Sequence, residues 1–208
     1  MNKPVADACD RNSEPIFNVI EPLFRNCKSV LEIGSGTGQH AVYFAARMPA
    51  LTWHTSDLAV SHEGIMAWIR DSGLDNIRQP VELDVKQGNW PELDIDGIFS
   101  ANTVHIMHMD EVERFIQGAG KLLPVRGKLV LYGPFNYQNR YTSESNARFD
   151  EWLKARDPGS GIRNFEDINN LASGAGMQFC RDYEMPANNR ILYWEKIIGR
   201  HRSKECTT

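Results

Sequence analysis

Residues 30–38 read VLEIGSGTG, an apolar run with one acidic residue followed by glycines at three alternate positions. The apolar residues are typical of a buried parallel strand, and the residues from Gln39 onward are typical of a helix. Gly34, Gly36 and Gly38 therefore fall in the turn between strand and helix. A backbone without Cβ atoms can bend sharply there and lie directly against a ligand. This stretch predicts an α/β fold with a nucleoside-type ligand at the turn.

The glycine spacing distinguishes this turn from the dinucleotide fingerprint. In G-x-G-x-x-G the following helix receives a pyrophosphate at its N-terminus. Here the third glycine comes one residue early, and Glu32 stands two residues before the first glycine. A carboxylate at that place suits an ammonium or a sulfonium ion better than a phosphate. The pattern E-x-G-x-G-x-G resembles the first motif of class I S-adenosylmethionine-dependent methyltransferases, which implies that Glu32, Gly34, Ser35, Gly36 and Gly38 bind that cofactor.

Composition narrows the class of protein. The chain has 208 residues, 41% of them hydrophobic and 24% charged, which fits a single globular domain over residues 1–208. A net charge of -4, with basic residues clustered only at 200–204, argues against nucleic-acid binding. The four cysteines form no C-x-x-C pair, and no signal peptide or membrane-length apolar run is visible. We expect a cytoplasmic protein without a membrane span or a metal site. The sequence does not indicate its oligomeric state.

Predicted strands and helices alternate along the chain, which is typical of a mostly parallel sheet with helices on both faces. An N-terminal helix is expected to begin near Ser13 and to end or kink at Pro22. Asp110 and Glu113 have the spacing of a helix cap. The expected strands cover 29–33, 51–56, 81–85, 97–101 and 128–132, with an antiparallel pair at 177–183 and 190–198.

Acidic residues follow the second and third predicted strands. Asp57 lies about 20 residues beyond the glycine turn, the distance at which a carboxylate meets ribose hydroxyls, and Leu58 follows it. Asp84, followed by Val85, resembles the acidic position that accepts the exocyclic amine of adenine. Either carboxylate could instead cap a helix or stand in a solvated loop. Trp90 could cover the adenine or anchor a loop.

The fourth predicted strand ends in a polar segment, and ligands bind at the carboxyl ends of strands in open α/β sheets. Asn102 is expected to face the methionine part of the cofactor. His105 is the candidate catalytic residue, because imidazole titrates near neutrality and could take a proton from an acceptor. A structural role for His105 remains the alternative.

The resemblance extends to nearly the whole chain. Several segments together are similar to the DUF938 family, which is related to methyltransferase-like protein 26. The family implies a Rossmann-like fold with a seven-stranded sheet in the order 3-2-1-4-5-7-6, including an antiparallel C-terminal edge strand. It also implies that segment 1–27 covers the cofactor, with Arg11 and Asn12 closing over it. The segments that carry the likeness are 9–16, 56–57, 67–68, 83–85, 90–91, 102–106 and 132–135.

The polar stretch at the start of segment 134–163 interrupts the strand-helix alternation and is the predicted substrate lid. Its Phe135, Tyr137 and Arg140 offer aromatic walls and a cation for an acceptor. The predicted function is methyl transfer from S-adenosylmethionine to a small-molecule acceptor, a carboxylate or an aromatic hydroxyl, with S-adenosylhomocysteine as product. Proximity and orientation would do most of the catalysis, and His105 would assist a hydroxyl.

Two other classes of function stay open. An NAD-dependent oxidoreductase shares the strand, turn and acidic residue, although this chain lacks the G-x-G-x-x-G phasing and a Tyr-x-x-x-Lys pair. A catalytically silent subunit that only binds S-adenosylmethionine is the second alternative. A nucleic-acid methyltransferase is disfavoured, since N-T-V-H stands where an N-P-P-[YF] tetrapeptide is expected.

Overall fold

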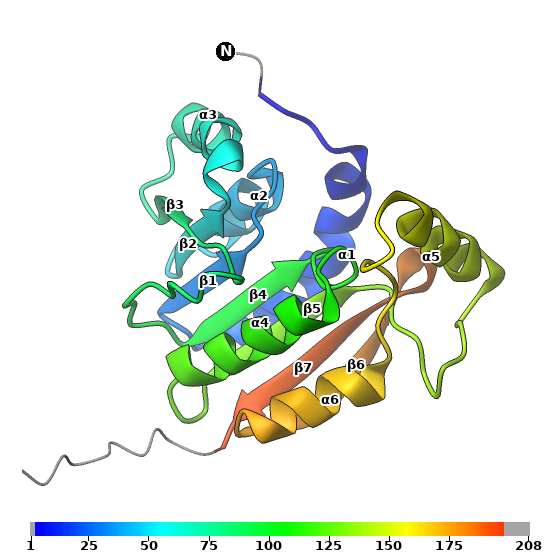
Figure 1. Ribbon diagram of the computed structural model, residues 1–208. Helices are drawn as coiled ribbons and strands as arrows, with labels where there is room; N and C mark the ends of the chain where they lie inside the picture. The colour runs from blue at the N-terminus through cyan, green and yellow to red at the C-terminus, as the bar shows by residue number, and fades with distance from the viewer. Residues whose placement is uncertain (1–2, 198–208) are drawn as a thin grey trace, which may run out of the picture.

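One mixed sheet, with its strands in the order β3-β2-β1-β4-β5-β7-β6, organises residues 3–197, which the computed structural model describes (Figure 1). The basic cluster 200–204 and Cys206 lie outside the described residues. The strands are β1 (Ser29–Ile33), β2 (Thr52–Asp57), β3 (Ile77–Glu82), β4 (Gly97–Ala101), β5 (Lys128–Gly133), β6 (Met177–Met185) and β7 (Asn189–Lys196).

The sheet confirms the predicted fold class. Strands β1 to β5 pair in parallel, and the C-terminal strand β7 runs antiparallel to both of its neighbours, β5 and β6. The hairpin between β6 and β7 inserts β7 between β5 and β6, so β6 is the outermost strand. This topology brings the carboxyl ends of β1, β2 and β4 to one edge of the sheet.

Helices cover both faces of the sheet (Figure 1). Buried side chains of α1 and α2 form one core with β1, β2, β4 and β5, and those of α4 and α6 form the other core. Within residues 3–197 no helix combines the length and the apolar character that crossing a membrane requires. The helices are α1 (Asp7–Phe24), α2 (Gln39–Arg47), α3 (His62–Ser72), α4 (Met109–Leu122), α5 (Glu144–Arg156) and α6 (Phe165–Gly174), with short 3-10 helices η1 (Ala59–Ser61) and η2 (Pro186–Asn188).

The N-terminal helix differs from the prediction. It begins at Asp7 rather than near Ser13 and continues through Pro22 to Phe24. Its face toward the sheet buries Ile16 and Ile20 completely. Burial of that apolar face stabilises the helix by more than proline destabilises it, so tertiary packing, not local helix propensity, sets the length of α1.

The third strand and the fourth helix also start elsewhere than predicted. Strand β3 covers Ile77–Glu82 rather than 81–85, because it pairs with β2 from Ile77 opposite Trp53. Leu83 and Val85 are buried in the turn beyond it. Helix α4 is capped two residues before Asp110: the Glu111 carboxylate accepts the His108 backbone N–H at 2.8 Å.

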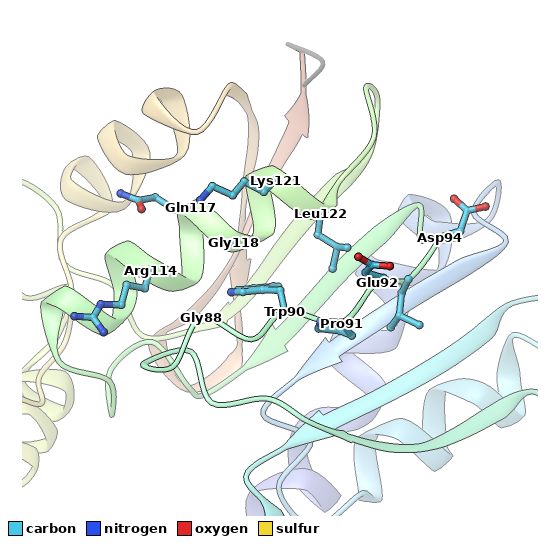
Figure 2. Close-up of a pocket in the computed structure, with 11 residues that line it drawn as sticks. Gly88, Trp90, Pro91, Glu92, Asp94, Arg114, Gln117, Gly118, Lys121 and Leu122 are labelled. Carbon is cyan, nitrogen blue, oxygen red and sulfur yellow. The ribbon is translucent and has the colours of Figure 1, made fainter. Parts of the chain in front are cut away.

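Trp90 anchors the loop between β3 and β4 to helix α4. Its ring stacks on Phe115 at an interplanar angle of 9°, and Figure 2 shows it lying against Gly118 in a surface groove of about 700 Å³. A Cβ on Gly118 would lie 1.9 Å from the Trp90 ring. The loop-anchoring interpretation of Trp90 is the one that this contact supports.

The Trp90 contact predicts that Gly118→Ala lowers the free energy of unfolding by about 1–3 kcal/mol, because the added methyl group displaces the ring. Urea denaturation measures the change. Gly174→Ala is the matched control, since a Cβ at Gly174 meets nothing within 4 Å. A Gly118→Ala protein as stable as the parent would contradict the packing described.

Candidate functional site

The turn after β1 has the backbone geometry that its glycines predict. Gly34 and Gly36 both have positive φ angles, 72° and 58°. A Cβ on Gly34 would lie 2.4 Å from Thr103 Cγ2, so only glycine fits there. A Cβ on Gly36 would meet nothing within 4 Å, so its backbone borders open space. The turn therefore presents bare backbone to a ligand at Gly36.

Hydrogen bonds hold the glycine turn to the end of β2. The N–H groups of Gly34 and Ser35 donate to Ser56 O at 3.0 and 2.9 Å. The Asp57 carboxylate accepts the N–H of Gly36 and the N–H of Leu58, each at 2.7 Å. Asp57 thus connects the glycine turn to the end of β2, and it borders a cavity at this edge of the sheet.

A cavity of about 490 Å³ lies at the carboxyl ends of β1, β2 and β4. Seven residues predicted to bind the cofactor line it: Gly34, Gly36, Asp57, Leu58, Asp84, Val85 and Asn102. Nine others complete the wall: Ile33, Ser61, Leu83, Lys86, Ala101, Thr103, Ile106, Met107 and Glu111. The cavity is a concave space with apolar walls and a few polar groups, the usual character of a small-molecule site.

Acidic side chains dominate the polar part of this cavity. Asp57 and Asp84 stand at adjoining turns, and Glu111 closes the wall in an ion pair with Lys86, with Nζ and Oε1 2.5 Å apart. Among residues 3–197 no cluster of three or more histidine, cysteine or acidic side chains could hold a metal ion. Carboxylates accept hydrogen bonds from hydroxyl and amine groups, so the cavity suits a ligand rich in those donors.

Glu32 lies beside the cavity rather than in its wall. The carboxyl group is buried, and Oε2 accepts the Trp53 indole N–H at 3.2 Å on the side of α1 and α2. Burial raises the pKa of Glu32 to about 7, and the nearby Asp57 charge adds to this increase. A cation bound at this edge would favour the ionised carboxylate.

The remaining residues predicted to bind the cofactor are Ser35 and Gly38 at the glycine turn and Arg11 and Asn12 in α1. Ser35 is buried and its hydroxyl accepts the Ser56 N–H at 3.2 Å. Gly38 is the N-cap residue of α2 and packs against α3. In α1, Arg11 is exposed, whereas Asn12 Oδ1 accepts from His40 Nε2 at 2.7 Å. The structure does not bring these four residues into the cavity wall.

Asn102 directly follows β4 and has a left-handed conformation, with a φ of 59°. Its N–H donates to Tyr132 O at 2.8 Å, which fixes the turn. Asparagine tolerates this region better than most residues, and such conformations concentrate at functional sites. The turn sets the Asn102 side chain in the cavity wall.

His105 is buried next to Asn102 and contacts α5. A Cβ on Gly133 would lie 3.7 Å from His105 Nδ1 and 3.8 Å from Asn102 Oδ1, so both polar groups approach the same point. The His105 ring meets Phe149 edge to face, with centroids 5.2 Å apart. Burial, reinforced by the positive charge of Arg163, lowers the pKa of His105 to about 4. The imidazole is therefore neutral at physiological pH.

The predicted substrate residues form a structural turn away from the cavity. Phe135 is buried in the core under α4 and α6. The Tyr137 hydroxyl donates to Asp182 Oδ2 at 2.5 Å. Arg140 is exposed and pairs through its backbone with Tyr137. Other residues of segment 134–163 reach His105: Phe149 contacts its ring, and the Gly161 N–H donates to its carbonyl at 2.8 Å.

Several cavity residues carry too little sequence signal to be found. Ile106 and Met107 resemble packing residues, and Lys86 and Glu111 resemble a solvated loop residue and a helix acid. One signal existed: Glu111 stands three residues after His108, the spacing of a capping box. It would have indicated where α4 begins at the cavity.

Known structures share this architecture. An O-methyltransferase family protein from Burkholderia thailandensis superposes with a TM-score of 0.79 at 19% identity, covering 93% of this chain and 59% of that protein. Human N-acetylserotonin methyltransferase in complex with S-adenosylmethionine gives a TM-score of 0.77 at 14% identity, covering 92% and 53%. The chain thus has the fold of the class I S-adenosylmethionine-dependent methyltransferases.

Sequence comparison assigns the family. The model described as "Protein of unknown function (DUF938)" matches residues 3–196, and the chain belongs to this family. It is also 23% identical over 158 residues to caffeic acid 3-O-methyltransferase from Catharanthus roseus. That match covers 74% of this chain and 41% of the plant protein, so the chain spans less than half of this relative.

The buried carboxyl of Glu32 predicts a pH-dependent stability. Its pKa is raised from 4.5 in the unfolded chain to about 7, so its stabilising protonated form is fully present below 4.5 and lost as pH rises through 7. Relative to Glu32→Gln, the parent should lose on the order of 3 kcal/mol between about pH 4.5 and pH 8. Urea denaturation at several pH values measures this difference.

Glu63→Gln, in an exposed position of α3, is the control and should follow the parent at every pH. A parent whose stability stays parallel to that of Glu32→Gln across this range would show that Glu32 keeps an ordinary pKa.

Proposed function

We propose that this protein transfers the methyl group of S-adenosylmethionine to a hydroxyl group of a small aromatic acceptor. The observation that carries the proposal is the pairing of two features at one edge of the sheet. One is a nucleoside-sized cavity with carboxylates at adjoining turns, and the other is a neutral, buried histidine beside it.

The cavity supports the choice of cofactor. Asp57 stands where a carboxylate can accept ribose hydroxyls, and Asp84 stands where one can accept the adenine amine. Leu58, Val85 and Ile106 supply the apolar surface that a purine ring packs against. The buried Glu32 and the acidic edge of the sheet favour a cationic ligand over a pyrophosphate. The human structural neighbour was solved with this same cofactor.

The residues around His105 support proton transfer from a hydroxyl. Within residues 3–197 no hydrogen bond engages its ring nitrogens, so a neutral imidazole is free to accept a proton. When bound, S-adenosylmethionine would supply a methyl group activated by its sulfonium charge, and the acceptor oxygen would take this methyl group in exchange for its proton. The hydroxyl proton goes to His105, and the loss of the sulfonium charge makes that protonation easier.

The acceptor class follows from the side chains near His105. Phe149 contacts the imidazole and stacks on Trp152 at an interplanar angle of 18°. The two rings form an aromatic surface near His105 against which an aromatic acceptor can pack. The carboxylate acceptor considered from the sequence depended on Arg140, which lies on an exposed turn outside the cavity wall. An aromatic hydroxyl therefore fits these surroundings better than a carboxylate, and the plant relative is named for an O-methylation of this kind.

Cofactor binding should depend on Asp57. Asp57→Asn is expected to weaken binding of S-adenosylmethionine by more than about 1 kcal/mol, about fivefold, because a charge-assisted acceptor is lost. Isothermal titration calorimetry of both proteins gives the ratio. Asp75→Asn, in an exposed position outside the cavity, is the control. An affinity of Asp57→Asn within twofold of the parent would remove the proposed role.

Methyl transfer should depend on His105. At saturating cofactor, His105→Gln is expected to slow methylation of phenols by a factor of about 100 to 10,000 and to leave cofactor affinity unchanged. Because its pKa is about 4, the His105-dependent rate should fall only as pH drops toward 4, and not near 6.5. Release of S-adenosylhomocysteine from a panel of phenols, carboxylic acids, amines and thiols measures the rate.

His54→Gln, on β2 and outside the cavity wall, should keep the parental rate. Parental turnover of phenols by His105→Gln would exclude His105 as the base, and turnover confined to carboxylic acids would contradict the acceptor class.

A further inference from the structure

The loop 104–107, which carries His105, is held along its length by the segment 159–163. Four consecutive carbonyl groups of the loop accept hydrogen bonds from that segment. Val104 O accepts from Arg163 Nε at 3.4 Å, His105 O from the Gly161 N–H at 2.8 Å, Ile106 O from Ser160 Oγ at 2.9 Å, and Met107 O from Arg163 Nη2.

Arg163 joins both sides of this contact. Its Nη2 also donates to Gly159 O at 2.7 Å, so one guanidinium group binds the carbonyls of Val104, Met107 and Gly159. Arg163 forms no ion pair within the part of the chain that the structure describes. The planar fork of an arginine can satisfy several fixed acceptors at once, which the single ammonium of a lysine cannot do in the same geometry.

The segment 159–163 is in turn attached to helix α5. Asp150 is buried in α5, and its Oδ1 accepts the Ile162 N–H at 2.6 Å. Its Oδ2 accepts from Tyr141 Oη and Lys154 Nζ, each at 2.6 Å. Contacts therefore continue from α5 through segment 159–163 to the loop that lines the cavity with Ile106 and Met107.

We propose that Arg163 is a positioning residue of the methyl-transfer site. It fixes the loop 104–107 against segment 159–163 and the cavity, so that the His105 imidazole is held in place. The proposal rests on the proposed function for its catalytic consequence, whereas its structural part concerns the loop alone.

The charges around His105 make Arg163 the group to test. Among the charged groups on the neighbouring elements, Asp150 and Lys154 of α5 form an ion pair with each other, and Asp157 binds His108 with Nε2 and Oδ2 2.8 Å apart. The other charged side chains of α5, Glu144, Arg148, Glu151 and Arg156, are exposed. Arg163 is the charge that acts on His105, in the direction that opposes protonation. Removing that charge and removing the guanidinium geometry are therefore separable changes.

Arg163→Met removes the charge and the hydrogen bonds, and Arg163→Lys keeps the charge alone. Arg148→Met, at an exposed position of α5, is the control. In the full chain, NMR titration of the His105 ring, assigned with His105→Gln, should show the pKa rising by more than about 0.5 unit in Arg163→Met and by less in Arg163→Lys. Amide hydrogen exchange of residues 104–107 should accelerate by about tenfold or more in both variants.

For catalysis, kcat should fall about tenfold or more in both Arg163 variants, with little change in the KM for the cofactor. Only Arg163→Met should shift the low-pH limb of the pH–rate profile to higher pH. Parental exchange of 104–107 and an unchanged His105 pKa in Arg163→Met would overturn the proposal. If that variant does not fold, parental exchange in Arg163→Lys and in Ser160→Ala would overturn it instead. A parent that methylates no acceptor, with the expected NMR and exchange changes, refutes the proposed function and leaves the positioning of the loop intact.

Discussion

The site depends on one constraint, the close attachment of the glycine turn to the end of β2. The turn reaches Ser56 and Asp57 through backbone N–H groups, and a side chain at Gly34 would collide with Thr103 beyond β4. Three parallel strands therefore have their carboxyl ends locked together before any ligand arrives. Because the polar groups are already in place, binding a nucleoside there requires little reorganisation.

The two cores of the protein stabilise this edge from opposite faces. On one face, α1 and α2 pack on Val30, Trp53 and Phe99, and on the other α4 and α6 pack on Leu31 and Ile98. The sheet edge itself carries polar groups, and Glu32 and His105 are buried there at the cost of altered pKa values. The rigid apolar layers thus hold a strained and polar site in position. In doubly wound sheets the ligand commonly binds at such a polar edge, outside the packed core.

The sequence predicted those parts of the site that local geometry determines. Gly34 and Gly36 have the positive φ angles that glycine allows, and Asp57 and Asp84 follow strands whose carboxyl ends meet at one edge of the sheet. The structure places these four residues in the cavity wall. Lys86 and Glu111 reach it through long-range packing, which leaves no local pattern. Phe135 and Tyr137, predicted to bind substrate, lie outside the cavity wall. Phe135 packs in the core, and Tyr137, just before the turn at Gln138 and Asn139, stacks on Phe165 of α6 and donates to Asp182 of β6.

The proposed function requires that the acidic edge at the β1 turn bind a cationic sulfur nucleoside. Calorimetric titration of the folded protein with S-adenosylmethionine, and separately with NAD, tests it most directly. We expect saturable binding of one S-adenosylmethionine per chain and no binding of NAD. A folded protein that binds NAD, or that binds neither compound, would contradict it.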